Sequence, residues 1–331
     1  MTKILVTGGA GYVGSVSAAA LVEAGHDVVV LDDLTTGHRA AVPADAIFHA
    51  GSYTDGDTIV GLLETEGIEA ILHCAARSVV GESVADPARY YRENVAGGIV
   101  LLEAARVVGV GRLVFSSTAA VYGIPESTPI LEDARLRPIN PYGATKLAFE
   151  GALAWYGQAY GLRSVALRYF NVAGATDTLG EAHDPETHLI PNVLRAAEKR
   201  GDLTLYGDDY DTPDGTCIRD YIHVADLADA HLRAIEATAP GDARTDGGLI
   251  CNLGTGGGFS NLEVIEAAER AVGRKIPFLV GPKRPGDPPI LVALAARAAE
   301  VLDWRPAQAS IDEMVGSAWE WRRTHPNGYR D

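Results

Sequence analysis

The sequence predicts an α/β fold, in which a doubly wound parallel sheet is followed by a smaller C-terminal α/β part. Short apolar runs rich in β-branched residues alternate with longer amphipathic stretches in the first half of the chain, which is the pattern of βαβ units. The 47% apolar and 22% charged residues are typical of a globular protein. From residue 176 onward the chain contains more Pro, Gly and Asp, and we therefore predict two domains, residues 1–175, with contributions from later segments, and residues 176–331.

The expected elements follow one another in βαβ order. Strands are predicted at 3–7, 27–32, 46–49, 70–75, 113–117 and 164–170. Helices are predicted at 12–24, 57–66, 84–108 and 142–160, and farther along at 189–199 and 226–236.

Local signals mark several helix ends. Glycines that can adopt a left-handed conformation follow three of these helices, at Gly25, Gly67 and Gly109. Two more helices in the second half are predicted from capping boxes, Ser260 with Glu263 and Ser310 with Glu313.

Charge and cysteine content exclude several classes of function. The 44 acidic and 28 basic residues give a net charge of −16, which argues against binding to nucleic acid or to an anionic membrane. The 3 cysteines are scattered and form no CxxC pair, so we expect neither disulfides nor a metal site, and a reducing cytoplasm fits best. No apolar stretch approaches the roughly 18 residues of a membrane-spanning helix.

A glycine-rich loop follows the first strand. It fits G-x-x-G-x-x-G with Gly8, Gly11 and Gly14, and it also fits G-x-G-x-x-G from Gly9. Such a loop brings backbone N–H groups close to a pyrophosphate at the start of the next helix. Asp32 ends the second strand, where a carboxylate accepts hydrogen bonds from adenosine ribose hydroxyls and repels a 2′-phosphate. The loop therefore predicts a Rossmann-like domain that binds NAD rather than NADP.

Tyr142 and Lys146 begin the helix predicted at 142–160. Asn140 and Pro141 are typical of a helix start, and residues four apart share one face of a helix. A nearby lysine, together with a positive nicotinamide ring, favours phenolate and should lower the pKa of the tyrosine toward neutrality. Tyr142 can then remove a proton from a sugar hydroxyl.

Thr118 lies at the end of a predicted strand. Ligands of doubly wound folds bind at this carboxyl edge of the sheet, so Thr118 can hydrogen-bond the reacting hydroxyl. Serine and threonine in this position also commonly cap the next turn.

These residues together match the pattern of extended short-chain dehydrogenases/reductases. Further segments resemble the UDP-galactose 4-epimerase family, in order along the chain: SSTAAVYG, NPYGATK, RYFNVAGA, DGTCIRDYIHVADLADAH, CNLGTG and KRPGDPP. The resemblance implies tightly held NAD, with Tyr142 as base, Lys146 and Thr118 as its partners, and a transient 4-keto sugar. It also implies a homodimer through the helices at 84–108 and 142–160.

The resemblance assigns two further sets of residues. Those implied to contact the cofactor, besides the glycines of the loop, are Tyr12, Val13, Asp32, Asp33, Asn94, Lys146 and Phe170. Those implied to contact the UDP-sugar, besides Thr118 and Tyr142, are Asn171, Leu189, Tyr206, Arg219, Arg284, Asp287 and Leu291. An aromatic ring can cover uracil, and two arginines can clamp a diphosphate. The family places a residue beside the sugar C2 substituent where Leu291 stands, and tyrosine there excludes N-acetylated sugars.

Three positions depart from the family. Ser78 replaces a common lysine, Ser52 a common aspartate near the adenine, and Leu294 a common aspartate. These changes remove side chains that other family members have at these positions, and Arg77 can compensate for the missing lysine.

Other readings remain open. A related 4-epimerase would act on N-acetylhexosamine, pentose or uronate derivatives of UDP. A sugar-nucleotide 4,6-dehydratase needs an acid–base pair after the threonine, where this chain has Ala119 and Ala120. A reductase is also possible, but the signatures of the uridine site favour internal return of the hydride. A non-catalytic NAD sensor would not need Tyr142, Lys146 and Thr118 together.

Overall fold

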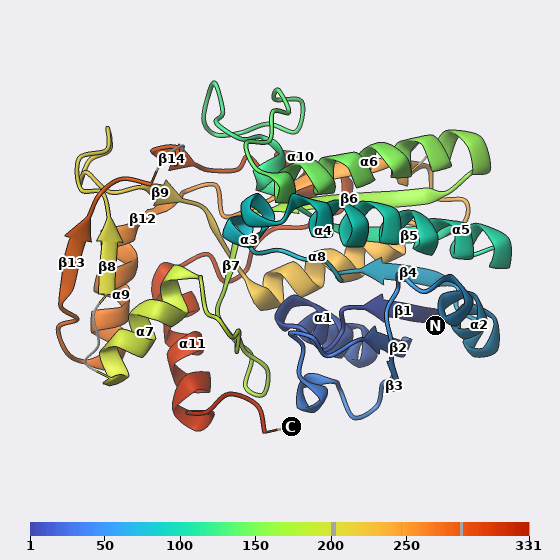
Figure 1. The fold of residues 1–331 in the computed structure, drawn as a ribbon, viewed down its shortest axis with the longest axis horizontal. Coiled ribbons are helices and arrows are strands. Elements are labelled where there is room, and N and C mark those ends of the chain that lie inside the picture. The colour runs from blue at the N-terminus through green and yellow to red at the C-terminus, as the bar shows by residue number, and fades with distance from the viewer. Residues whose placement is uncertain (200–202, 246, 285–286, 331) are drawn as a thin grey trace.

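The centre of the protein is a parallel sheet of seven strands (Figure 1). The computed structural model describes residues 1–199, 203–245, 247–284 and 287–330. Strand order in the sheet is β11-β6-β5-β4-β1-β2-β3, and every neighbouring pair is parallel. The strands are β1 (Lys3–Thr7), β2 (Asp27–Asp32), β3 (Ile47–Ala50), β4 (Ala70–His73), β5 (Arg112–Thr118), β6 (Arg163–Tyr169) and β11 (Leu249–Leu253). This order confirms the predicted doubly wound fold.

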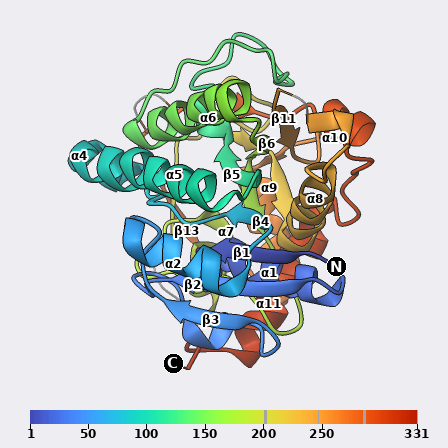
Figure 2. The same ribbon diagram turned by 90° about the vertical axis from the view of Figure 1, so that its right-hand side faces the viewer.

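Helices cover both faces of the sheet, as the view along it shows (Figure 2). One face carries α1 (Tyr12–Glu23) and α8 (Val224–Ala237), and the other carries α2 (Gly56–Glu66), α5 (Gly98–Val108) and α6 (Pro141–Tyr160). Each face has its own apolar core, because alternate side chains of one strand point to opposite sides. Val30 of β2 thus packs into the core beneath α1, whereas Leu31 packs into the core beneath α2.

The local helix signals are confirmed. Gly25, Gly67 and Gly109 have φ angles of 84°, 65° and 90°, in the left-handed region. Both capping boxes are formed, at the starts of α9 (Asn261–Val272) and α11 (Ile311–Thr324).

The single helix predicted at 84–108 is wrong. The chain instead forms α3 (Val80–Ala85), α4 (Pro87–Tyr90), a π-helical segment at Tyr91–Gly97 and then α5. Pro87 disfavours helical geometry at Asp86, which has φ −135° and ψ 73° and caps α4 by accepting from the Arg89 N–H at 3.1 Å. Asn94 lies in the π-helical segment, a geometry that is frequent at functional sites.

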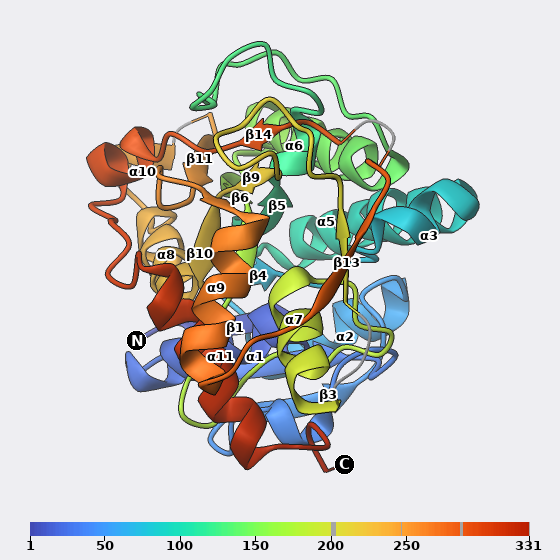
Figure 3. The ribbon, with the colours of Figure 1, turned by 90° about the vertical axis from the view of Figure 1, so that its left-hand side faces the viewer.

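The second half of the chain builds a separate core next to the carboxyl ends of the strands (Figures 1 and 3). Its helices are α7 (Leu189–Lys199), α9 and α11, with α10 (Ala296–Val301) near β11. Its short strands form three small sheets: β10 (Tyr221–His223) with β7 (Asn171–Ala173); β12 (Phe259–Ser260), β9 (Ile218–Arg219) and β14 (Ile290–Leu291); and β13 (Phe278–Gly281) with β8 (Leu203–Tyr206). Two later segments, α8 and β11, return to the main sheet and pack in its core. Among the described residues, no helix has the length and apolar character that crossing a membrane requires.

Candidate active site

The glycine loop makes a tight turn between β1 and α1. Gly8 has a φ of +71°, and a Cβ at this position would lie 2.6 Å from the backbone nitrogen of Ala75. A Cβ at Gly14 would lie 2.1 Å from the carbonyl oxygen of Gly8. Gly11 is the N-cap of α1 and offers no side chain to its first N–H groups. The loop therefore has the shape of a phosphate cradle and fits the pyrophosphate of a dinucleotide.

Asp32 braces this loop from the end of β2. Its carboxylate accepts from the Ala10 N–H at 3.0 Å and from the Leu34 N–H at 2.9 Å. Burial raises the pKa of Asp32, while the two backbone hydrogen bonds oppose the rise. Each carboxylate oxygen has a second lone pair, so the acceptor capacity needed for ribose hydroxyls is retained.

The start of α6 is built as the sequence predicts. Asn140 accepts from the Gly143 N–H at 2.9 Å, and Pro141 occupies the first turn. Tyr142 and Lys146 consequently lie one turn apart, with the Lys146 Nζ 6.0 Å from the centre of the Tyr142 ring. Lys146 is 3% exposed and donates to the carbonyl oxygen of Ser116 at 2.7 Å. The hydrogen bond to Ser116 fixes the ammonium group at the end of β5.

The protein groups alone do not lower the pKa of Tyr142, so the predicted lowering depends on the nicotinamide ring. Burial raises the pKa of Tyr142, and a hydrogen bond with the Thr118 hydroxyl opposes the rise. Burial also lowers the pKa of Lys146 to about 8, which weakens it as a source of positive charge near neutral pH. Any lowering of the Tyr142 pKa must therefore come mainly from the positive charge of a nicotinamide ring.

Thr118 stands at the carboxyl end of β5, as predicted. Its Oγ accepts from the Ala120 N–H at 3.1 Å, so it caps the next turn, and its hydroxyl also bonds Tyr142. Both readings of this threonine, turn cap and partner of a reacting group, are therefore compatible. Thr118, Tyr142 and Lys146 are brought together at the edge where the glycine loop also lies.

A buried network of polar side chains lies beneath these three residues, and the sequence did not predict it. Glu150 accepts from the Ser117 hydroxyl at 2.5 Å and from the Arg168 Nη2 at 2.6 Å. Arg168 also donates to the Tyr122 hydroxyl at 2.9 Å, and Tyr122 donates to Asn252 at 2.6 Å. The network ties α6 to strands β5, β6 and β11. The only feature of the sequence that could have indicated this network is the placement of Glu150 and Arg168 at positions expected to be buried.

The other residues implied for the cofactor lie on several elements. Tyr12 is buried and donates to the Gly174 carbonyl oxygen at 2.6 Å, whereas Val13 is half-buried. Asp33 is exposed after β2. Asn94 uses its amide within the protein, accepting from the Arg77 N–H at 2.9 Å and donating to the Arg77 carbonyl oxygen at 3.0 Å. Asn94 thus orients the segment after β4, whatever else it contacts.

Phe170 marks the border with the predicted substrate residues. It is buried in an apolar cluster with Tyr122, Ile130 and Ala293, and Leu291 packs against the same cluster. Leu291 also pairs in register with Arg219, since β14 runs parallel to β9. The structure therefore places Leu291 between a residue implied for the cofactor and one implied for the diphosphate.

The residues implied for the UDP part form two groups. In one, Arg219 forms an ion pair with Asp287 and donates to the Ile218 carbonyl oxygen at 2.8 Å. In the other, the Arg284 guanidinium lies 4.2 Å from the centre of the half-exposed Tyr206 ring. One face of this ring is therefore covered by a cation, and uracil would have to use the other face or displace the arginine.

The remaining substrate residues lie near these groups or at their border. Asn171 donates from its side chain to the Asp220 carbonyl oxygen at 3.0 Å, next to Arg219 in the chain. Leu189 begins α7 and is half-buried against the core of the second half. Pro285 and Gly286 of the KRPGDPP segment lie outside the described residues.

The structure shows the surroundings of the three positions that depart from the family. Ser78 is exposed, and Arg77 beside it forms an ion pair with Glu93 at 2.5 Å. The Arg77 guanidinium, which was expected to replace the missing lysine, is therefore already engaged. Ser52 hydrogen-bonds the Thr54 hydroxyl at 2.9 Å. The Leu294 N–H donates to the Ile130 carbonyl oxygen at 2.9 Å.

Comparison with known proteins agrees with this geometry. The model of the NAD dependent epimerase/dehydratase family matches residues 4–254. The UDP-glucose 4-epimerase of Streptomyces lividans is 53% identical over 99% of this chain and 98% of its own length. The structure of UDP-glucose 4-epimerase from Brucella ovis in complex with NAD is 48% identical, with a TM-score of 0.92 over 96% of this chain and 98% of that chain.

A further structure, UDP-glucose 4-epimerase from Bifidobacterium longum in complex with NAD⁺ and UDP, is 37% identical. Its TM-score is 0.92 over 99% of this chain and 100% of that chain. The glycine loop, the group at the start of α6 and a likeness that extends over the whole length all lead to one assignment. This chain belongs to the NAD dependent epimerase/dehydratase family.

Proposed function

We propose that this protein is an NAD-dependent isomerase that interconverts UDP-galactose and UDP-glucose by inverting C4 of the sugar. The observation that carries the proposal is the meeting of Thr118, Tyr142 and Lys146 at the carboxyl edge of the sheet, beside the glycine loop. The full-length likeness to UDP-glucose 4-epimerases supports the choice of substrate. Ala119 and Ala120 after Thr118 argue against a dehydratase, because neither can protonate a leaving hydroxyl.

The two parts of the chain bind different ligands. Residues 1–175, with contributions from later segments, hold NAD through Gly8, Gly11, Gly14 and Asp32. Residues 176–331 hold the UDP-sugar, with Arg219 and Arg284 facing the diphosphate. NAD held there would supply the hydride acceptor for C4 and, once reduced, the hydride donor for the transient 4-keto sugar.

The chain itself moves the proton. Tyr142 takes the proton of the 4-hydroxyl as hydride leaves C4, and it returns this proton when hydride comes back. The Thr118 hydroxyl already bonds Tyr142 and so lies within reach of the same sugar hydroxyl. Ser116 of β5 holds the Lys146 ammonium one turn along α6 from Tyr142. Because burial lowers the pKa of Lys146 to about 8, its charge supports the phenolate form less than the nicotinamide ring does.

The purified protein should release NAD on heating and should interconvert the two UDP-sugars without added cofactor. Chromatographic identification of the released nucleotide and a turnover assay with UDP-galactose check both points. Recovery of NADP, or no turnover of either sugar, would contradict the proposal. Accumulation of a 4-keto-6-deoxy sugar would show a dehydratase instead.

Leu291→Tyr should narrow the range of sugars. We expect the wild type to use UDP-N-acetylgalactosamine measurably but less well than UDP-galactose, because leucine leaves more room than tyrosine. Forcing extra atoms into a packed site typically costs 1–3 kcal/mol, so the variant should disfavour the N-acetylated sugar by roughly 5- to 150-fold more. The measurement is the ratio of kcat/KM for the two sugars.

A matched control is Leu279→Tyr on β13, since Leu279 is 65% exposed and is not among the residues proposed to contact the UDP-sugar. It should leave the ratio of the two sugars unchanged. If Leu291→Tyr also leaves it unchanged, Leu291 is only a core residue and another side chain limits the pocket.

We also propose a homodimer that buries the outer faces of α3–α5 and α6. These faces expose large apolar side chains, among them Val84 at 64% and Trp155 at 70%. Sedimentation at micromolar concentration should show a dimer, and Trp155→Glu should shift it toward monomer. Ile124→Glu, at a 56% exposed apolar position outside these helices, is the control. A wild type that sediments only as monomer would reject the dimer.

A cytoplasmic location completes the proposal. Cys74, Cys217 and Cys251 are free thiols, which persist in a reducing compartment.

A further inference from the structure

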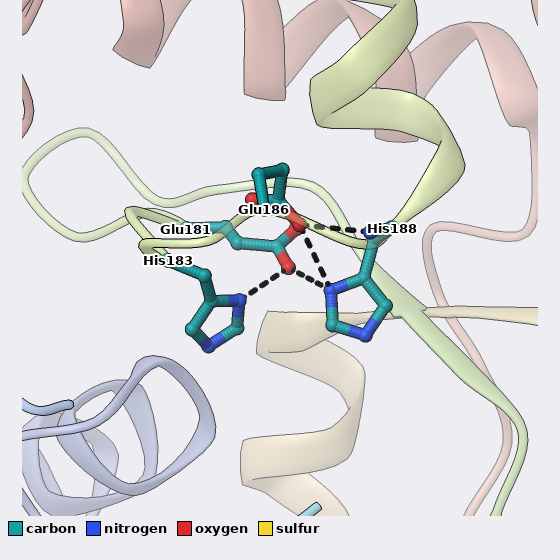
Figure 4. Close-up of side chains that lie close together, drawn as sticks. All are labelled: Glu181, His183, Glu186 and His188. Carbon is teal, nitrogen blue, oxygen red and sulfur yellow. Dashed lines mark hydrogen bonds and ion pairs between the residues drawn. The ribbon is translucent and has the colours of Figure 1, made fainter. Parts of the chain in front are cut away.

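Four side chains of metal-binding type converge in the segment between β7 and α7 (Figure 4). Glu181 Oε1 lies 2.9 Å from His183 Nδ1 and 2.5 Å from His188 Nδ1. His188 Nδ1 also lies 3.3 Å from Glu186 Oε1. One donor atom from each of the four residues lies within 4.8 Å of the other three. The figure shows the two carboxylates between the two imidazole rings.

We propose that Glu181, His183, Glu186 and His188 bind one divalent transition-metal ion of the zinc class. Two imidazole nitrogens and two carboxylate oxygens form a donor set that zinc accepts in tetrahedral geometry, with bonds of about 2.0–2.2 Å. Such bonds place neighbouring donor atoms about 3.3–3.6 Å apart, which follows from the same bond lengths and tetrahedral angles. Three of the donor pairs are 2.5–3.3 Å apart and all lie within 4.8 Å, so small movements of the side chains would admit the ion.

The charges and exposure of the four groups suit a cation. Two carboxylates cancel the charge of a divalent ion when the imidazoles are neutral. The side chains of Glu181 and Glu186 are only 8% and 2% exposed, so water cannot fully solvate their charges. The His188 side chain is 53% exposed, which gives an ion a path from solvent. The acidic surface of the protein also raises the local concentration of cations.

Backbone N–H groups and the His38 ring hold the ligand segment in place. Glu186 Oε1 accepts from the backbone N–H groups of Thr187 and His188, both at 2.8 Å. The carbonyl oxygen of Ala182, between two of the ligands, is 2.9 Å from His38 Nε2. Such outer contacts orient the ligands of metal sites.

The site would join the two halves of the chain. The His183 ring contacts the edge of the Tyr12 ring, at the start of α1, with ring centres 6.3 Å apart. His188 directly precedes Leu189, where α7 begins. An ion bound by four protein ligands would thus fix the segment between the glycine loop and α7, which is a structural role. The inference does not depend on the proposed reaction, and it replaces the expectation from the sequence that the chain binds no metal.

The test measures binding of Zn²⁺ alone to the untagged full-length protein after treatment with a chelator. Equilibrium dialysis with elemental analysis should give one Zn²⁺ per chain, and Mg²⁺ should not compete, because nitrogen ligands disfavour it. Co²⁺ in the same site should show visible absorption typical of a four-coordinate ion, without the sulfur charge-transfer bands that cysteine ligands would add.

The decisive variant is the double substitution His183→Gln with His188→Gln. It should weaken Zn²⁺ binding by more than the roughly 10- to 100-fold that follows loss of an outer partner in metal sites. The control is His49→Gln, because His49 pairs with Glu66 at 3.0 Å and is not one of the four proposed ligands. Circular dichroism checks that each variant is folded.

Two results would overturn the inference. One is a wild type that binds less than half an equivalent of Zn²⁺ at concentrations up to tens of micromolar, a result that no folding defect of a variant can affect. The other is a folded double variant that binds Zn²⁺ as tightly as the wild type. In either case the four side chains form only a hydrogen-bonded ion-pair cluster.

Discussion

Replacing Tyr142 by phenylalanine should lower kcat by at least the roughly 10²-fold that loss of a general base typically costs. The change removes one oxygen and leaves the ring in its half-buried place at the start of α6. Affinity for UDP should change little, because the Arg219–Asp287 and Tyr206–Arg284 groups are untouched. Steady-state kinetics with UDP-galactose, together with calorimetric titration of UDP, separates the two effects.

Two further variants sharpen this test. Thr118→Ala should lower kcat less, since Tyr142 remains to take the proton. Tyr160→Phe removes a hydroxyl from the same helix at a 59% exposed position and should leave kcat unchanged. A Tyr142→Phe enzyme that turns over at a near-normal rate would show that another group acts as the base.

Local chemistry made much of the sheet and its loop predictable. Strands β1 and β2 have the predicted bounds, because each is a short apolar run that ends at a turn residue. The glycine loop was identifiable because its backbone geometry admits no side chain at Gly8 or Gly14. The start of α6 was identifiable for a similar reason, since Asn140 and Pro141 carry their own capping signal.

Contacts between distant segments could not be predicted in this way. The seventh strand, β11, pairs with β6 although some eighty residues separate them, and no local signal shows where such a strand will add. The sequence did indicate the break in the predicted helix 84–108, because Asp86 precedes Pro87. The helical spacing of the apolar residues nevertheless led to the prediction of one continuous helix.

Some residues of the site could likewise be placed from local sequence, and others could not. Tyr142 and Lys146 were placed by the periodicity of one helix, whereas the pairing of Arg219 with Asp287 depends on segments that are far apart in sequence. The sequence does not show that burial raises the pKa of Tyr142, because burial is a property of the folded chain. The four ligands proposed for a metal were missed because they approach one another only when the loop before α7 folds.

The network beneath Thr118 leads to the largest expected loss of stability. Glu150→Ala would leave the Arg168 guanidinium buried without its carboxylate, and both side chains of this ion pair are nearly inaccessible, at 2% and 3% exposure. Removing one partner of such a pair typically costs about 3–5 kcal/mol, because the remaining charge is neither solvated nor compensated. The Ser117 hydroxyl would lose its acceptor at the same time. The midpoint of urea unfolding should fall accordingly, without a change in slope.

Two other variants show how much of this loss of stability comes from the uncompensated charge on Arg168. Glu126→Ala removes a glutamate from an exposed pair with Arg135 and should change the free energy of unfolding by less than about 0.5 kcal/mol. Replacing Glu150 and Arg168 together by leucine removes both charges, so it should destabilise the protein less than Glu150→Ala does, even though it deletes more hydrogen bonds. If the double replacement is instead the more damaging, the hydrogen bonds to Ser117 and Tyr122, rather than the charge on Arg168, account for the stability of this layer.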